Sequence, residues 1–189
     1  MNIIEENKTM KYDFVKEVLV THDEIVKYCQ KIAQQLETEY QNEEIVLVCV
    51  LKGSVPFTAE LLKNFKRTDI MCEFVRASSY DGETVESSGN VEISCDTLVD
   101  ANDKVIILVE DILDTGRTLF ALKEHFMNRN AKAVKTLTLL DKPERREIDI
   151  AADYVGFSIP NYFVVGFGLD YAEKYRNLPD IIIPYPEKL

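Results

Sequence analysis

The residues best suited to chemistry lie in one short segment near the middle of the chain. Five apolar residues, 105–109, precede the carboxylates Glu110 and Asp111, and the sequence Asp-Thr-Gly-Arg-Thr follows at 114–118. The apolar run predicts a buried strand, the two acids an acidic turn, and the hydroxyls and glycine the start of a helix. Ligands of open parallel sheets bind where the strands end, so this segment is the first candidate site.

A ribose phosphate fits this segment. Free N–H groups at a helix start attract an anion, Gly116 lets the backbone approach it closely, and Thr115 and Thr118 can add hydroxyl donors. Glu110 and Asp111 would repel a phosphate, but the vicinal hydroxyls of a ribose can donate to carboxylates. The alternative is a polar loop in which the acids only help to cap the helix.

The elements that must position this segment alternate along the chain. Thr21 and Glu24 have the T-x-x-E spacing of a capping box, with apolar residues at helical spacing after them. Helices are expected over 23–40 and 57–65 and after Thr118, and strands at 45–51, 70–77, 105–109, 133–140, 153–157 and 163–167. This alternation predicts an α/β fold with a central, mainly parallel sheet flanked by helices.

Length and charge exclude several classes of protein. The 189 residues suit one domain, 1–189, with a single core. They include 22 Lys and Arg against 33 Asp and Glu, a net charge of -11. Nucleic acids and anionic membranes bind dense basic patches, so neither is expected as a partner.

Hydropathy and cysteine spacing indicate the cytoplasm. No apolar run reaches the ~18–20 residues of a membrane helix, and the N-terminus carries no apolar signal-peptide stretch. The four cysteines form no C-x-x-C pair, which predicts buried free thiols in a reducing compartment.

Residues 109–118 resemble the phosphoribosyl pyrophosphate signature of the type I phosphoribosyltransferases, most closely of members that use 6-oxopurines. Supporting segments are Leu-Lys-Gly at 51–53, the polar stretch 78–90, Leu-Asp-Lys-Pro at 140–143 and residues 163–176. The resemblance covers roughly residues 45–178. It implies a small hood, built from the N- and C-terminal segments, over the carboxyl edge of the sheet, and assembly as a homodimer or homotetramer.

The resemblance implies a purine salvage reaction. The 5-phosphoribosyl group of phosphoribosyl pyrophosphate would pass to hypoxanthine or guanine, giving IMP or GMP plus pyrophosphate. Negative charge builds on the leaving group, so Mg2+ is expected as cofactor. The candidate metal residues are Asp170, Glu110 and Asp111.

The same resemblance assigns the sugar and leaving-group contacts. Asp114 is the candidate general base for the purine N7 proton, with a helix cap as its alternative role. The phosphoribosyl group is expected to contact Glu110, Asp111, Asp114, Thr115, Gly116, Arg117 and Thr118. Pyrophosphate is expected to contact Lys52, Gly53 and Arg176, in a turn that the family builds with a non-proline cis peptide.

The base contacts follow from two further segments. Lys142 can donate to a 6-oxo group but would face the amino donor of adenine. Phe163 could stack on the purine, with Val164 and Asp170 offering backbone carbonyls to a 2-amino group. Ser79 and Tyr80 belong to the polar stretch, which is expected to be a mobile loop that closes over the reacting atoms; the alternative is an ordinary hairpin loop.

Two rival functions remain open. One is an enzyme of the same fold that prefers xanthine or a pyrimidine, and Lys142 with Phe163 separates xanthine poorly. The other is a non-catalytic regulator that binds the nucleotide or phosphoribosyl pyrophosphate without turnover. Such regulators usually carry an added DNA-binding element or a basic surface, neither of which is expected here.

Overall fold

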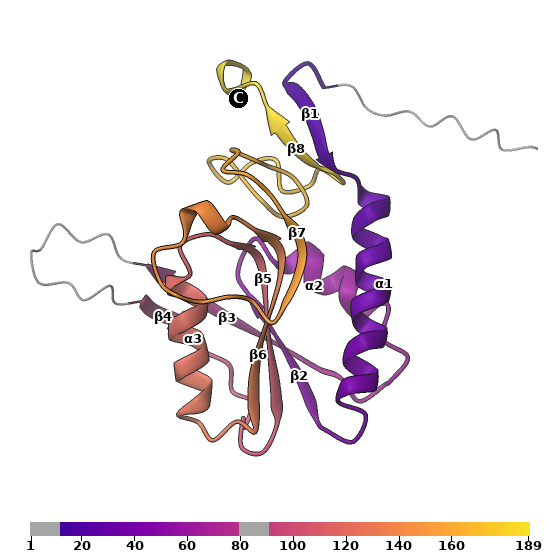
Figure 1. The fold of residues 1–189 in the computed structure, drawn as a ribbon, viewed down its shortest axis with the longest axis vertical. Coiled ribbons are helices and arrows are strands. Elements are labelled where there is room, and N and C mark those ends of the chain that lie inside the picture. The colour runs from indigo at the N-terminus through magenta and orange to yellow at the C-terminus, as the bar shows by residue number, and fades with distance from the viewer. Residues whose placement is uncertain (1–11, 80–90) are drawn as a thin grey trace, which may run out of the picture.

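The computed structural model describes residues 12–79 and 91–189. A six-stranded sheet forms the centre, in the order β4-β3-β2-β5-β6-β7 (Figure 1). All neighbouring strands are parallel except β4, which pairs antiparallel with β3 at the edge. The strands are β2 (Ile45–Val50), β3 (Met71–Ser79), β4 (Val91–Cys95), β5 (Val105–Leu113), β6 (Ala133–Asp141) and β7 (Tyr154–Ser158). The expected mainly parallel α/β fold is confirmed.

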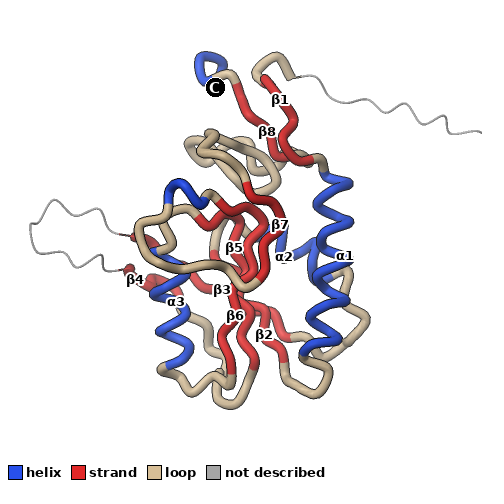
Figure 2. Tube along the Cα trace, in the orientation of Figure 1, coloured by secondary structure: helices blue, strands red, loops and turns tan. Residues whose placement is uncertain are grey.

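Three helices cover the sheet, two on one face and one on the other (Figure 2). They are α1 (His22–Glu39), α2 (Val55–Leu62) and α3 (Arg117–Met127). In β5, Val105, Ile107 and Val109 pack with α1 and α2, whereas Ile106 and Leu108 pack with α3. Successive side chains of a strand point to opposite faces, so an apolar run such as this one fills both cores.

The first helix begins as its sequence predicts. Thr21 is the N-cap of α1, and both bonds of the capping box with Glu24 are present. The buried residues of α1 include Ile25, Cys29 and Leu36, which share one helix face against the sheet. The expected helix over 23–40 is therefore confirmed to within one residue at each end.

The first and last strands of the described chain pair with each other beyond the sheet's carboxyl edge, at the top of Figure 1. Strand β1 (Val15–Val20) runs antiparallel to β8 (Ile181–Pro184). A small apolar cluster of Val165, Leu178 and Ile182 joins this pair to the 159–180 segment. Two 3-10 turns complete the elements, η1 (Pro143–Arg145) and η2 (Pro186–Lys188).

Two expectations about strands are wrong. Residues 163–167 form no strand, because Gly166, Phe167 and Gly168 have φ values of 101°, 46° and 102°, which turn the chain out of extended geometry. The strand expected at 105–109 continues to Leu113, so Glu110 and Asp111 lie in β5 and not in a turn. Strands β1, β4 and β8 were not expected.

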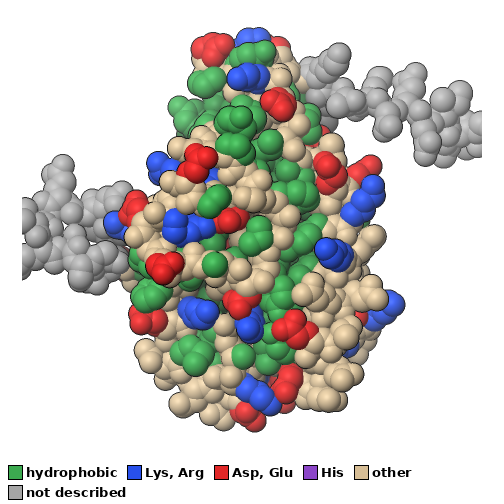
Figure 3. All heavy atoms as spheres, in the orientation of Figure 1, with side chains coloured by type: hydrophobic (Ala, Val, Ile, Leu, Met, Phe, Trp, Pro, Cys, Tyr) green, Lys and Arg blue, Asp and Glu red, His purple; other side chains and the backbone are tan. Residues whose placement is uncertain are grey.

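The surface agrees with the charge balance, but the expectation for the cysteines needs correction. On the face in Figure 3, Lys and Arg are interspersed with Asp and Glu, without a continuous basic patch. Cys29 and Cys49 are buried, whereas Cys72 is partly exposed and Cys95 is exposed; all four are free. In the described part of the chain, no helix is long and apolar enough to cross a membrane.

Leu108 provides a test of the two-sided core. Its side chain is fully buried on the face of the sheet that α3 covers, whereas Leu98 is 99% exposed. Leu108→Ala should cost about 2–5 kcal/mol of unfolding free energy, since it removes buried methyl groups and leaves a cavity. Leu98→Ala is the matched control and should leave stability nearly unchanged. Urea unfolding of both variants measures the difference, and equal midpoints would contradict this packing.

Candidate active site

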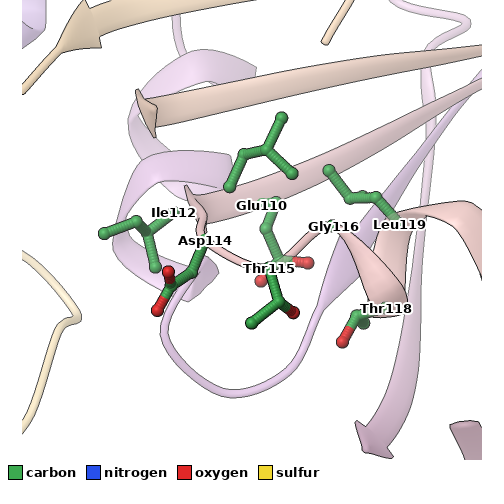
Figure 4. Close-up of a pocket in the computed structure, with 8 residues that line it drawn as sticks. Glu110, Ile112, Asp114, Thr115, Gly116, Thr118 and Leu119 are labelled. Carbon is green, nitrogen blue, oxygen red and sulfur yellow. The ribbon is translucent and has the colours of Figure 1, made fainter. Parts of the chain in front are cut away.

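A pocket opens where β5 ends and the chain turns into α3 (Figure 4). It is lined by Glu110, Ile112, Leu113, Asp114, Thr115, Gly116, Thr118 and Leu119. Five of these eight are candidate site residues from the sequence: Glu110, Asp114, Thr115, Gly116 and Thr118. The pocket therefore lies at the carboxyl edge of a parallel sheet, where ligands of such sheets bind.

The loop between β5 and α3 is held by the segment that follows η1. Gly116 is the N-cap of α3 with φ 89°, and a Cβ there would lie 2.5 Å from Cγ2 of Ile150. The carbonyl of Thr115 accepts bonds from the backbone N–H groups of Glu147 (3.0 Å) and Ile148 (3.2 Å). A side chain at position 116 would separate these two segments, so a glycine is required.

Asp114 lies outside α3, which corrects its alternative role. The helix begins at Arg117, its N-cap is Gly116, and no side chain caps it. Oδ1 of Asp114 instead accepts a bond from Nε of Arg145, at 3.1 Å. Arg146 donates to the carbonyls of Leu113 and Asp114 and to the Asp141 carboxylate, which ties the loop to the end of β6.

Lys142 lies next to this loop and is buried, although its sequence neighbours are charged. Its backbone N–H donates to the carbonyl of Leu113, at 3.0 Å. Burial lowers the pKa of Lys142, and the carboxylate of Asp114 partly offsets that effect. The structure thus brings the candidate base and the candidate 6-oxo donor to one place.

Glu110 and Asp111 are adjacent carboxyl groups that are partly buried. Burial raises the pKa of both, and the negative charge of Asp111 raises that of Glu110 further. Arg176 acts in the opposite direction on Asp111. Among the described residues, Oε2 of Glu110 has no hydrogen-bond partner. A buried oxygen without a partner is costly in a stable protein and is typical of a site that awaits a ligand.

A second group of residues surrounds the turn after β2, where the Leu51–Lys52 peptide is cis. A Cβ on Gly53 would lie 1.6 Å from Oδ2 of Asp111, and a Cβ on Gly168 would lie 1.9 Å from the carbonyl oxygen of Gly53. The side chain of Asp111 and the backbone of Gly53 and Gly168 therefore meet without room for a side chain at either glycine. This contact brings Lys52 to the 166–176 segment.

The charged side chains of this group are joined in pairs. Arg176 contacts Oδ1 of Asp170 at 2.9 Å and donates to the carbonyl of Gly168 at 2.8 Å. Lys52 and Arg176 both contact Oε2 of Glu173, at 3.0 and 3.1 Å. Arg117 is not part of this group, since its guanidinium pairs with Glu147 at 2.7 Å.

The remaining candidates are placed in different ways. Phe163 is 47% exposed and meets Tyr171 edge to face at 5.7 Å between ring centroids, while Val164 is buried. Ser79 ends β3 and pairs with Val91 across the hairpin. Tyr80 and the rest of the expected mobile loop, 80–90, lie outside the described residues.

Sequence reasoning missed four charged residues that organise the site. Glu173 lies between Lys52 and Arg176, and Arg145, Arg146 and Glu147 hold the loop before α3. The spacing of Glu173 and Arg176 by three residues was the available signal for one of them. The others belong to a charge run that is typical of solvated surface.

The acids fit a Mg2+ ion that is shared with a substrate. No group of three or more His, Cys, Asp or Glu in the described ranges could hold a metal alone. Mg2+ usually binds one or two carboxylates together with waters and phosphate oxygens. The unpartnered Oε2 of Glu110 beside Asp111 provides such carboxylates, whereas both oxygens of Asp170 already accept bonds, from Arg176 and from the N–H of Glu173.

Comparison with known families agrees with this arrangement. The phosphoribosyl transferase domain matches residues 17–172, which include both groups of site residues up to Asp170. The chain belongs to the phosphoribosyl transferase domain family. Strand β5, the loop after it and α3, which include residues 109–118, all lie within the matched range.

Curated relatives within this family are similar over most of their length. Hypoxanthine-guanine phosphoribosyltransferase of Streptococcus thermophilus is 50% identical over 165 residues, covering 87% of this chain and 91% of the relative. The protein of that name from Streptococcus pneumoniae is 50% identical over 167 residues, with 88% and 92% covered.

Solved structures of phosphoribosyltransferases show the same fold. A hypoxanthine phosphoribosyltransferase from Staphylococcus aureus has a TM-score of 0.88 and 43% identity, covering 97% of this chain and 98% of that one. A hypoxanthine-guanine phosphoribosyltransferase from Bacillus anthracis has a TM-score of 0.83 and 44% identity, covering 91% and 98%.

Glu110 provides a test of how much stability the protein loses by holding a carboxyl group in this site. Its pKa is raised above the ordinary value of 4.5 by burial, so the folded protein holds a proton that the unfolded chain releases as pH rises through 4.5. Stability is therefore lost above that pH. Glu110→Gln should raise the thermal midpoint at pH 7, by about 2–4 °C for each kcal/mol relieved. The gain should vanish near pH 4.

The matched control is Glu187→Gln, a change at an exposed carboxylate. It should leave the thermal midpoint unchanged at both pH values. A Glu110→Gln protein that is no more stable than the native chain at pH 7 would show that Glu110 is not desolvated in the folded state. Differential scanning calorimetry at the two pH values makes the comparison.

Proposed function

We propose that this purine salvage phosphoribosyltransferase transfers the 5-phosphoribosyl group of phosphoribosyl pyrophosphate to hypoxanthine or guanine, giving IMP or GMP plus pyrophosphate. The observation that carries the choice of base is the position of buried Lys142, whose N–H binds the carbonyl of Leu113 and whose charge interacts with Asp114, a residue of the β5 pocket. The names of relatives at 50% identity support the same choice.

In this proposal the end of β5 binds the ribose and the start of α3 binds its phosphate. Glu110 and Asp111 accept the ribose hydroxyls, which gives the buried oxygen of Glu110 a donor. The phosphate accepts hydrogen bonds from the backbone N–H groups of 115–118 and from the hydroxyls of Thr115 and Thr118. The helix dipole stabilises an anion at this helix start. Arg117, whose guanidinium pairs with Glu147, adds a positive charge to this phosphate site.

The base is recognised and activated by two groups of opposite charge. The ammonium of Lys142 donates to the 6-oxo oxygen, and its burial excludes competing water. Asp114 takes the proton from N7 as the glycosidic bond forms. Arg145 holds Oδ1 of Asp114, which leaves Oδ2 to receive that proton. Phe163 stacks on the purine, with the carbonyls of Val164 and Asp170 near a 2-amino group.

The leaving group is held by Lys52, the backbone of Gly53, and Arg176. Pyrophosphate oxygens suit the planar fork of a guanidinium, and Lys52 adds a second cation across the turn. Mg2+ bound by Glu110 and Asp111, with Asp170 acting through water, would neutralise charge on the leaving group. Ser79 and Tyr80 close over the reacting atoms in this scheme.

The proposal also covers the compartment and the assembly of the enzyme. Four free cysteines suit a reducing cytoplasm, where thiols persist. A homodimer or homotetramer stays a prediction from the family. The rival role as a regulator receives no support from the face in Figure 3, which lacks a continuous basic patch.

A panel of bases tests the proposed reaction. The protein is incubated with phosphoribosyl pyrophosphate, Mg2+ and, in turn, hypoxanthine, guanine, xanthine, adenine or uracil, and nucleotide is measured by chromatography. Hypoxanthine and guanine should give nucleotide, whereas adenine should not, because its amino group would meet the donor of Lys142. No product from either oxopurine would overturn the proposal. Efficient use of adenine would overturn the role of Lys142 alone.

Asp114→Asn tests the proposed base separately. Loss of general base catalysis should slow turnover by about 10²–10⁴-fold, while binding of phosphoribosyl pyrophosphate stays close to the native value. Steady-state kinetics and calorimetric titration measure the two quantities. Asp149→Asn, a change at an exposed carboxylate beyond η1, is the control and should retain turnover. Native turnover by Asp114→Asn would remove Asp114 from the chemistry.

A further inference from the structure

Glu173 has a position that the proposed reaction does not use. Its Oε2 atom lies 3.0 Å from Nζ of Lys52 and 3.1 Å from a guanidinium nitrogen of Arg176. These two cations are the ones proposed to hold pyrophosphate. One carboxylate oxygen thus lies between the two positive groups that await an anionic oxygen.

The backbone fixes this placement. Tyr171 and Lys174 exchange both backbone hydrogen bonds, at 3.2 and 3.0 Å, and close a two-residue turn. The turn residues Ala172 and Glu173 have φ values of 50° and 65°, a geometry in which Asn and Gly are preferred. Oδ2 of Asp170 accepts a bond from the N–H of Glu173, at 2.9 Å. Glutamate is therefore an uncommon choice at the tip of this turn.

The charges explain why a carboxylate suits this tip. Gly168 and Gly53 touch, which brings Lys52 and Arg176 to the same anion although they lie 124 residues apart. Two positive charges that both lie close to one oxygen atom repel each other unless an anion lies between them. The two cations also hold the pKa of Glu173 below its usual value, so the side chain is charged at neutral pH.

We propose that Glu173 is a built-in competitor of pyrophosphate, whose carboxylate takes the place of a leaving-group oxygen and is displaced when the substrate binds. This inference rests on the proposed function, since it takes Lys52 and Arg176 as the pyrophosphate contacts. The side chain of Glu173 is 65% exposed, so it can rotate into solvent without movement of the backbone. Arg176 keeps its contacts with Asp170 and Gly168 meanwhile.

The need to displace the Glu173 carboxylate lowers the affinity for pyrophosphate and for substrates that carry a pyrophosphate group. Binding breaks two ion contacts of Glu173 before new ones form, which weakens retention of the leaving group. A purely supporting role for Glu173 predicts the opposite sign, because loss of a support loosens the site. The direction of the change in affinity therefore separates the two roles.

Glu173→Gln is the informative variant, since it keeps the shape of the side chain and removes its charge. Inorganic pyrophosphate is titrated calorimetrically into the full-length protein in the presence of Mg2+. The variant should bind about threefold to tenfold more tightly than the native chain, in line with the strength of exposed ion pairs. The Michaelis constant for phosphoribosyl pyrophosphate should fall in the same direction.

Glu43→Gln is the matched control. Glu43 forms an ion pair with Lys132 at 2.7 Å at the opposite end of the sheet, and its loss should leave pyrophosphate binding unchanged. Unchanged or weaker binding by Glu173→Gln overturns the inference, as does equal tightening by the control. Glu173→Asn, which suits the positive φ, provides the same test if the first variant folds poorly.

The two levels of proposal fail in different ways. A native chain that binds no pyrophosphate contradicts the proposed function of Lys52 and Arg176. A native chain that binds pyrophosphate, together with a Glu173→Gln variant that gains nothing, contradicts the role of Glu173 alone.

Discussion

The close contact of Gly53 with Asp111 and Gly168 is the constraint on which the site depends. The Asp111 carboxylate occupies the space of a Cβ at Gly53, and the Gly53 carbonyl occupies that of a Cβ at Gly168. Through these contacts the end of β5, the turn after β2 and the 166–176 segment form one unit. Residues from three distant parts of the sequence can reach one ligand only because two of these positions lack side chains.

Charge is arranged in this unit at a cost to stability. Glu110 and Asp111 are partly buried with raised pKa values, and Oε2 of Glu110 is unpaired among the described residues. Burial of such groups lowers the free energy of unfolding, so the fold must offset it elsewhere. The apolar strands on both sides supply that stability, since β2 and the first half of β5 are buried on both faces. A rigid sheet thereby supports carboxylates that are costly to bury.

The sequence predicted what depends on local pattern. The capping box at Thr21, the apolar run at 105–109 and the alternation of strands and helices need only neighbouring residues to be recognised. Residues 163–167 show the limit, because Phe-Val-Val-Gly-Phe has the composition of a strand. It turns instead at 166–168, where φ is positive and Gly168 lies against Gly53, a contact that no local pattern contains. The burial of Lys142 within a charged run has the same origin, since it depends on the loop after β5.

The site also gives a narrower meaning to the net charge of -11. Lys52, Arg117 and Arg176 were expected to contact the anionic substrate, but in the structure each already has at least one carboxylate partner. Lys52 pairs with Glu173, Arg117 with Glu147, and Arg176 with Asp170 and Glu173. Lys142 is instead buried beside Asp114. Part of the acidic excess thus neutralises the cations of the site before any substrate arrives. An anionic ligand must exchange places with these acids, so its affinity reflects a difference between two sets of ion pairs and not the sum of the new contacts.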